Sequence, residues 1–208
     1  MGRAPSFCGV ILAAGDSSRM GQPKALLPWR GGTFLSGAIR SLTPYTDMVI
    51  VVGGRNWKQI EPIVDVNAAF LVVNDQPELG QFSSLKVGLQ EVLNRGRDAA
   101  IITLVDRPPA APATLQLLRD EFLSRIRQNE TWAAIPEYDG KHGHPIVVGR
   151  EIIGKVLDAT PTSNAREILH CHEERIAYVP VNDPFVAMNI DTPEDYERLS
   201  ALETPVSR

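Results

Sequence analysis

Short apolar runs alternate along the chain with longer segments in which apolar residues recur at the helical period. The runs are rich in β-branched residues and continuously apolar, as expected for parallel strands that are buried on both faces. Strands are predicted at Cys8–Ala13, Met48–Val52, Phe70–Val73, Ala99–Val105 and Trp132–Pro136. Helices are predicted between them at Phe34–Ser41, Trp57–Val64, Ser83–Asn94 and Pro112–Arg127. This alternation predicts a three-layer α/β/α fold around a mostly parallel, Rossmann-like sheet.

The ends of two predicted helices carry sequence signals. Ser83 and Ser84 offer an N-cap, Gly96 suits the end of the same helix, and Pro112 suits a first helical turn. We therefore expect these helices to begin and end close to the predicted bounds.

The alternation changes after Pro136. Residues 137–145 include several residue types that favour turns, and a strand is predicted after them at Ile146–Val148. This pattern predicts a small hairpin extension of the sheet. The remaining elements are predicted as short helices at Ile152–Leu157 and Ala165–Cys171, a strand at Ile176–Val179 and a closing helix at Pro193–Leu202 with Thr192 as N-cap.

Length and charge narrow the class of protein. The 208 residues suit one domain spanning 1–208, and the net charge of −4 gives no electrostatic reason to expect a nucleic-acid or membrane partner. Cys8 and Cys171 form no disulfide framework or metal-binding spacing. No apolar run approaches the roughly 20 residues that span a bilayer, and residues 1–6 lack the features of a secretory signal. We expect a cytoplasmic protein.

The strongest chemical feature is the glycine-containing loop after the first predicted strand. Gly15 allows close approach of the backbone to a ligand, and N–H groups along the loop can point at phosphate oxygens. Arg19 and Lys24 add full positive charges, which suit catalysis at a phosphate. The glycine spacing matches neither the dinucleotide fingerprint nor the P-loop, and an ordinary glycine-rich turn is the alternative. The predicted nucleotide-binding residues of this loop are Leu12, Ala13, Ala14, Gly15, Ser17, Ser18 and Gly21.

Asp106 follows the fourth apolar run, and Arg107-Pro108-Pro109 stops the strand behind it. A carboxylate at the end of this predicted strand suits Mg²⁺, which takes a few carboxylate ligands together with phosphate oxygens and water. Asp106 is therefore predicted as a catalytic residue and metal ligand, with a strand-ending turn aspartate as the alternative.

Ser83 and Ser84 place two hydroxyls and free backbone N–H groups at a helix start. A plain N-cap needs only one serine. We predict that both contact the base or ribose of the nucleotide.

Five segments in order resemble the molybdenum-cofactor nucleotidyltransferases, the MobA-like NTP transferases of the glycosyltransferase-A-like nucleotidyltransferase group. The segments are Leu12–Lys24, Gly80–Leu85, Thr103–Asp106, Gly143–Pro145 and Asn189–Asp195. The resemblance covers nearly the whole chain and implies the fold of that group. It also implies attack by a substrate phosphate on the α-phosphate of a nucleoside triphosphate, with release of pyrophosphate. Arg107 is a departure, because the family usually has methionine there.

The resemblance implies roles for further residues. Asp191 matches a second metal-proximal acid, although Asn189–Asp195 is also a good helix start in which Asp191 would serve the helix. Gly143, His144 and Pro145 match the turn that shapes the acceptor pocket. Arg166 would bind the phosphate of the acceptor, but the preceding Pro161-Thr162-Ser163 departs from the family pattern.

Ala14 and the segment Thr33–Ser36 resemble the CTP-using branch of the family more than the GTP-using branch. The implied acceptor is molybdopterin carrying molybdenum, the implied product is molybdopterin cytosine dinucleotide, and transient docking to a molybdoenzyme is expected. One alternative is a GTP-using enzyme or a sugar- or alcohol-phosphate nucleotidyltransferase of the same fold. Another is a non-catalytic chaperone for the molybdenum cofactor. The presence of Arg19, Lys24 and Asp106 together argues against a role limited to binding.

Overall fold

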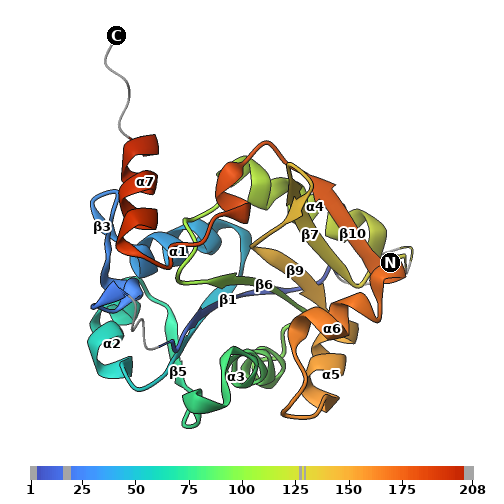
Figure 1. Cartoon of the computed structure of the whole chain (residues 1–208). Coiled ribbons are helices and arrows are strands. Elements are labelled where there is room, and N and C mark those ends of the chain that lie inside the picture. The colour runs from blue at the N-terminus through green and yellow to red at the C-terminus, as the bar shows by residue number, and fades with distance from the viewer. Residues whose placement is uncertain (1–3, 16–19, 127, 129, 204–208) are drawn as a thin grey trace.

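A computed structural model describes residues 4–15, 20–126, 128 and 130–203 (Figure 1). Within these residues an eight-stranded sheet has the order β10-β7-β9-β6-β1-β4-β5, and β8 pairs with β7. The strands of this sheet are β1 Phe7–Ala13, β4 Met48–Gly53, β5 Phe70–Val73, β6 Ala99–Leu104, β7 Ala133–Tyr138, β8 Lys141–His142, β9 Ile146–Gly149 and β10 Ile176–Pro180.

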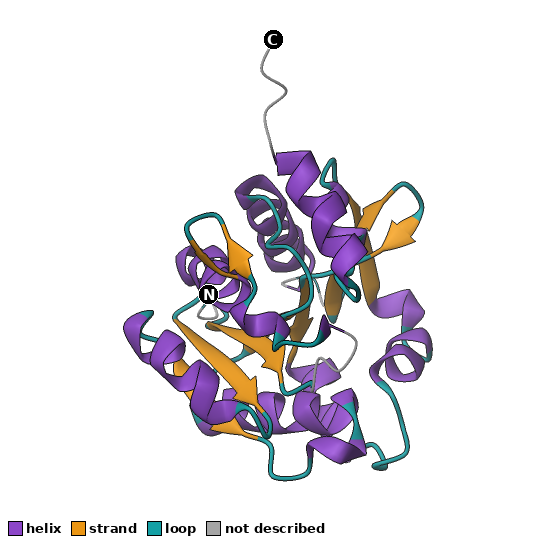
Figure 2. Cartoon of the chain, turned by 60° about the vertical axis from the view of Figure 1, so that its left-hand side comes forward, coloured by secondary structure: helices purple, strands orange, loops and turns teal. Residues whose placement is uncertain are grey.

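Helices cover both faces of the sheet, so the predicted three layers are confirmed (Figure 2). The helices are α1 Phe34–Leu42, α2 Trp57–Val66, α3 Gln81–Asn94, α4 Pro112–Ile126, α5 Arg150–Asp158, α6 Ala165–His170 and α7 Pro193–Glu203. In Figure 1, α1 and α4 lie above the sheet, and α3 and α5 lie below it.

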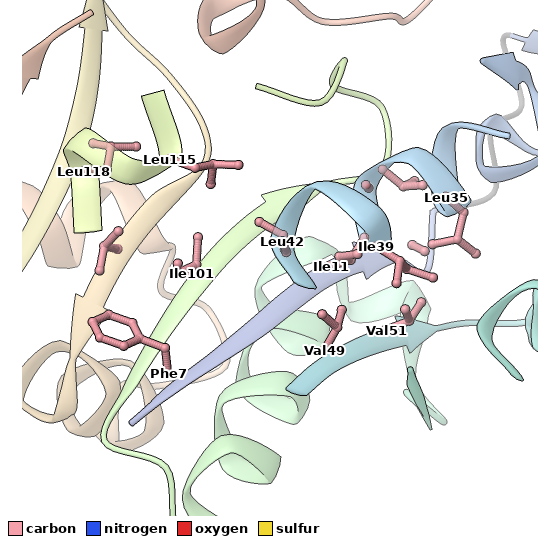
Figure 3. Packing of buried hydrophobic residues seen from close by; sticks show 14 of the residues in the cluster. Phe7, Ile11, Leu35, Ile39, Leu42, Val49, Val51, Ile101, Leu115 and Leu118 are labelled. Carbon is pink, nitrogen blue, oxygen red and sulfur yellow. The ribbon is translucent and has the colours of Figure 1, made fainter. Parts of the chain in front are cut away.

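Alternate residues of β1, β4 and β6 enter two separate apolar layers, which explains why these strands are almost entirely apolar. On one face, Leu35, Ile39 and Leu42 of α1 pack against strand residues that include Ile11 and Val51 (Figure 3). On the other face, α3 and α5 cover the intervening residues of the same strands.

The direction of the strands decides which loops meet. β1 is parallel to β4 and to β6, and β7 is parallel to β10. β9 is antiparallel to both β6 and β7, so β6 and β7 run in the same direction. Leu12 pairs with Leu104, and Ile102 pairs with Ile146. The segments after β1 and β6 and the turn before β9 therefore share one edge of the sheet.

Several boundaries differ from the sequence predictions. β6 ends at Leu104, so Val105 lies beyond it. α3 begins at Gln81 and its N-cap is Gly80, so the prediction that Ser83 or Ser84 caps the helix is wrong. Gly80 has a φ of 90°, a region that side chains rarely adopt, and this backbone turn starts the helix earlier.

Other predicted boundaries are confirmed. α4 begins at Pro112, and Gly96, with a φ of 68°, follows the end of α3. The 137–148 segment forms the predicted hairpin extension, in which β8 pairs antiparallel to β7.

Short elements were not predicted, because two to four residues carry no usable periodicity. They are the hairpin of β2 Pro28–Trp29 and β3 Gly32–Thr33 and the 3₁₀ turns Lys24–Leu26, Thr43–Tyr45, Pro77–Leu79, Glu173–Arg175 and Pro184–Ala187. None of the helices in the described part of the chain has the length and apolar character that a membrane crossing requires.

Candidate nucleotidyl-transfer site

A cavity of about 290 Å³ lies at the carboxyl-terminal ends of β1 and β6. Parallel α/β sheets bind their ligands at this edge. The lining residues are Leu12, Ala14, Gly15, Lys24, Pro77, Gly80, Gln81, Ser84, Leu104, Val105, Asp106 and Asp191. The cavity therefore joins the end of β1, the end of β6, the start of α3 and the segment before α7.

Three charged residues from distant parts of the chain meet in this cavity. Lys24 Nζ lies 2.6 Å from Asp191 Oδ1 and 3.4 Å from Asp106 Oδ2. The Lys24 side chain is only 11% exposed, whereas the two carboxylates are 28% and 31% exposed. A buried ammonium is costly without opposite charge nearby, and the carboxylates supply that charge. Among the described residues, the Lys24 ammonium is therefore held between two carboxylates in this cavity.

Backbone hydrogen bonds bring the two carboxylates together. Val105 N donates to Leu12 O at 3.0 Å, which extends the contact between β1 and β6 past the end of the strand. Ile190 N donates to Asp106 O at 2.8 Å, and this bond holds the segment before α7 against the end of β6. These bonds bring the chain segments that carry Asp106 and Asp191 together, so that both carboxylates can contact Lys24.

The start of α7 is capped without the side chain of Asp191. Thr192 N donates to Asp195 Oδ2 at 2.9 Å, and Asp195 N donates to Thr192 Oγ1 at 3.3 Å. Backbone hydrogen bonds from Asp191 and Thr192 lower the pKa of Asp195. This reciprocal arrangement is a capping box, and Thr192 is the predicted N-cap. Asp195 therefore provides the acidic side chain that caps the helix, while the Asp191 carboxylate contacts Lys24.

The two carboxylates fit a divalent cation. Asp106 Oδ1 is buried and has no hydrogen-bond partner among the described residues. Such an oxygen is a strong ligand for a hard cation, and Mg²⁺ commonly uses one or two carboxylates and takes its other ligands from phosphate and water. In the described residues no group of three or more histidine, cysteine, aspartate or glutamate side chains could hold a metal ion. The described residues would therefore supply only part of a coordination shell.

The Gly143–Pro145 turn lies at the same edge of the sheet but does not line the cavity. His144 N donates to Val186 O at 2.9 Å, and a Cβ on Gly143 would collide with that carbonyl. Burial and the charge of Arg107 lower the pKa of His144 to about 3, so the imidazole is neutral at physiological pH. The turn is thus packed tightly against the Pro184–Ala187 segment.

Arg107, the departure from the family pattern, contacts the same carbonyl of Val186 as His144 does. Its Nη1 donates to Val186 O at 3.0 Å. Burial lowers the pKa of the guanidinium, and the charges of Asp106 and Asp191 oppose that shift.

The structure brings some of the predicted site residues together and separates others. Leu12, Ala14, Gly15, Lys24, Ser84, Asp106 and Asp191 line the cavity. Ala13 is buried in the core beneath α1, and neither Gly21 nor Ser83 is part of the lining. Arg166 is exposed at the start of α6 and also lies outside the lining. Ser17, Ser18 and Arg19 lie outside the described residues.

Five lining residues were not among the predicted site residues: Pro77, Gly80, Gln81, Leu104 and Val105. Pro77 begins a 3₁₀ turn that leads directly into Gly80 and α3. A proline and a glycine close together before a helix are a turn signal, and that signal could have drawn attention to this wall of the cavity.

Similar proteins align with nearly the whole chain. The model of the MobA-like NTP transferase domain matches residues 9–176. A molybdenum cofactor cytidylyltransferase of Escherichia coli K12 is 27% identical over 188 residues, which are 90% of this chain and 92% of the relative. A probable molybdenum cofactor guanylyltransferase of Rhodopirellula baltica is 39% identical in an alignment of length 204 that covers 92% of this chain and 90% of the relative.

A solved structure has the same fold. Rv0371c from Mycobacterium tuberculosis H37Rv superposes with a TM-score of 0.78 at 28% identity, over 93% of this chain and 97% of that one. A complex of the same relative with manganese superposes with a TM-score of 0.74, again over 93% and 97% of the two chains, at 26% identity. The predicted fold class is thereby confirmed, and a divalent metal is compatible with this architecture. The chain belongs to the MobA-like NTP transferase family.

Proposed function

We propose that the protein transfers the cytidylyl group of CTP to the phosphate of molybdopterin carrying molybdenum. The reaction releases pyrophosphate and forms molybdopterin cytosine dinucleotide. The observation that carries the proposal is the Lys24 ammonium between the carboxylates of Asp106 and Asp191, in a cavity that begins at the loop after β1. This arrangement has the groups that transfer at a phosphate requires.

Nucleotidyl transfer depends mainly on positioning and on neutralising charge at the reacting phosphate. The backbone at Ala14 and Gly15 lines the cavity and can approach phosphate oxygens closely. Lys24 brings a positive charge to the same place, and its two ion pairs hold the ammonium in position before substrate binds. We assign Arg19, Ser17, Ser18 and Gly21 to the same phosphate-binding loop on the sequence pattern.

Asp106 and Asp191 would hold the divalent cation, which we propose to be Mg²⁺. The buried Asp106 Oδ1 without a partner among the described residues supports this assignment, as does the manganese complex of the M. tuberculosis relative. The cation would draw negative charge from the triphosphate oxygens. Lys24 contacts both carboxylates and lines the cavity, so its ammonium would also neutralise charge on a phosphate bound there.

We place the acceptor on the other side of Asp106, beside the turn of Gly143, His144 and Pro145. The neutral His144 shapes this region and does not act as a general base, because a phosphate nucleophile is already ionised near neutral pH. Arg166 is proposed as a phosphate contact of the acceptor at the rim.

We propose cytosine as the base for two reasons. Ala14, which resembles the CTP-using branch of the family, lines the cavity. The E. coli cytidylyltransferase is also similar over nearly the whole chain. GTP is the second candidate, favoured by the 39% identity to the probable guanylyltransferase of R. baltica. We further propose that residues 1–208 form one nucleotidyltransferase domain that works in the cytoplasm and passes its product to a molybdoenzyme by transient docking.

The test is release of pyrophosphate by the purified protein with Mg²⁺, molybdenum cofactor and each nucleoside triphosphate in turn. We expect the fastest release with CTP and none when Mg²⁺ or the cofactor is left out. Faster release with GTP would move the protein to the guanylyltransferase branch. Binding of the cofactor with no turnover of any triphosphate would support the chaperone alternative instead.

A further inference from the structure

Asn74 connects the sheet to the wall of the cavity formed by the start of α3. It follows β5 directly and is only 4% exposed. Its backbone N donates to Gly53 O at 2.9 Å, at the end of the neighbouring strand β4. Its side chain hydrogen-bonds to both Ser83 and Ser84. A buried polar side chain is thus fixed at the backbone and directed at the predicted nucleotide-binding serines.

The contacts define the orientation of the Asn74 amide. Gln76 N lies 3.0 Å from Oδ1, and a backbone N–H can only donate, so the atom facing it has to be the oxygen. The amide nitrogen then faces the two serines, with Nδ2 2.8 Å from Ser83 Oγ and 2.9 Å from Ser84 Oγ. Because the NH₂ group has two hydrogens, each hydroxyl oxygen accepts one of them.

The hydrogens of the two hydroxyls have different surroundings. Ser83 Oγ lies 2.8 Å from Gly80 O and 3.2 Å from Gln76 O, so its hydrogen is used within the turn before α3. Ser84 Oγ accepts from Asn74, and among the described residues no acceptor is within reach of its own hydrogen. Ser84 is 3% exposed and lines the cavity. The Ser84 hydroxyl can therefore donate only into the cavity.

We propose that Asn74 is a positioning residue: it makes the Ser84 hydroxyl a hydrogen-bond donor to an oxygen of the nucleotide, either on the base or at the ribose 2′ position. This inference rests on the proposed function and gives the two serines different roles. Ser84 contacts the ligand, and Ser83 closes the turn that carries Gly80 and Gln81 into the cavity wall. A ligand without an acceptor at this point would leave the hydrogen of the Ser84 hydroxyl buried and unpaired, which is unfavourable.

The variant Asn74→Asp tests this inference with little change of shape. An aspartate still accepts from Gln76 N, but its second oxygen can only accept. The Ser84 hydrogen would therefore turn away from the cavity and toward the new carboxylate. We expect the dissociation constant of Mg-CTP, measured by calorimetry without acceptor, to rise roughly three- to tenfold. Ser84→Ala removes the same donor and should weaken binding by a similar factor.

The double variant separates the proposed route from an effect of the added charge. If Asn74 acts through Ser84, Asn74→Asp should change affinity little in the Ser84→Ala background. Asn67→Asp is the matched control, because it makes the same substitution at the end of α2, where Asn67 Nδ2 donates to Ile63 O. The control should bind Mg-CTP as the wild type does, and thermal unfolding should show that each variant is folded.

Three results would overturn the inference. Multiplying effects in the double variant would show that Asn74 does not act through Ser84, and unchanged affinity in both single variants would exclude the hydrogen bond. Both results leave the proposed function standing. If wild-type protein bound neither Mg-CTP nor Mg-GTP, the proposed function and this inference would fail together. Repeating the cycle with 2′-deoxy-CTP locates the acceptor, since coupling that persists assigns the base and coupling that disappears assigns the ribose.

Discussion

The two halves of the sheet, on either side of β6, differ in regularity. The half with β1, β4 and β5 consists of parallel strands, and its strand ends and following loops line the cavity. The half with β9, β7 and β10 contains an antiparallel strand and the β7–β8 hairpin. In the regular half, Ala14 and Gly15 line the cavity together with Lys24, which suits a triphosphate. The irregular half replaces such a loop with the packed Gly143–Pro145 turn, which suits a specific acceptor.

Asp106 lies between these halves, so its loss should affect the proposed reaction most. Asp106→Ala removes the carboxylate whose Oδ1 has no partner among the described residues. We expect pyrophosphate release with Mg²⁺ to fall by about 10³-fold, the size seen when a group that stabilises charge in the transition state is removed. Thermal unfolding of the variant should stay close to that of the wild type. Full activity in a folded variant would place the metal elsewhere.

Lys24 belongs to the regular half and should act on the triphosphate. Lys24→Met keeps much of the apolar stem but removes the ammonium between the two carboxylates. We expect the rate of pyrophosphate release to fall by about 10²-fold, because charge at the reacting phosphates is no longer neutralised. The KM for the acceptor should change less than the KM for CTP. The reverse order would assign Lys24 to the acceptor half.

Gly143 tests the irregular half. In Gly143→Ala the new Cβ would meet the carbonyl of Val186, and the turn would have to shift. We expect a loss of about 2 kcal/mol in the free energy of unfolding. The KM for the acceptor should rise while Mg-CTP affinity stays nearly constant.

Gly154→Ala is the matched control for that substitution. Gly154 lies in α5 and has open space at its Cβ position. Alanine there should stabilise the protein by roughly 0.5 to 1 kcal/mol. If Gly143→Ala shifted CTP affinity and acceptor affinity equally, the two halves would not be functionally separate.

His144 should have a smaller effect, on how the free energy of unfolding depends on pH. Its pKa is about 3 in the folded protein, below its usual 6.5, so the unfolded chain binds the proton more readily between these values. Stability should therefore fall as the pH decreases from 6.5 toward 3, and His144→Gln should remove at least about 1 kcal/mol of this decrease. Denaturant unfolding at several pH values measures it. An identical pH dependence in the variant would show that His144 does not contribute.

The regular half was predicted well from the sequence, because apolar runs and helical periods describe parallel βα units directly. The strands β1, β4, β5 and β6 lie within one residue of their predicted bounds. Lys24 and Asp106 were predicted in a single site and meet there, since the ends of parallel strands share an edge.

The short turns of the site could not be predicted in the same way. The 3₁₀ turns at Pro77–Leu79 and Pro184–Ala187 are too short to show a period, and their positions depend on contacts across the fold. The roles of Ser83 and Ser84 depend on Asn74, and nothing in the sequence pattern indicates that contact. The sequence also left open whether the Asp191 side chain serves the start of the helix or the cavity, and its contact with Lys24 places it in the cavity.

The most direct test of the central claim is the identity of the dinucleotide formed in competition. Purified protein, Mg²⁺ and molybdenum cofactor are incubated with equal concentrations of CTP and GTP, and the product is analysed by mass spectrometry. We predict molybdopterin cytosine dinucleotide as the main product, with one pyrophosphate released for each molecule formed. A guanine dinucleotide as the main product would contradict the assignment of CTP, and the absence of any dinucleotide would contradict the proposed reaction.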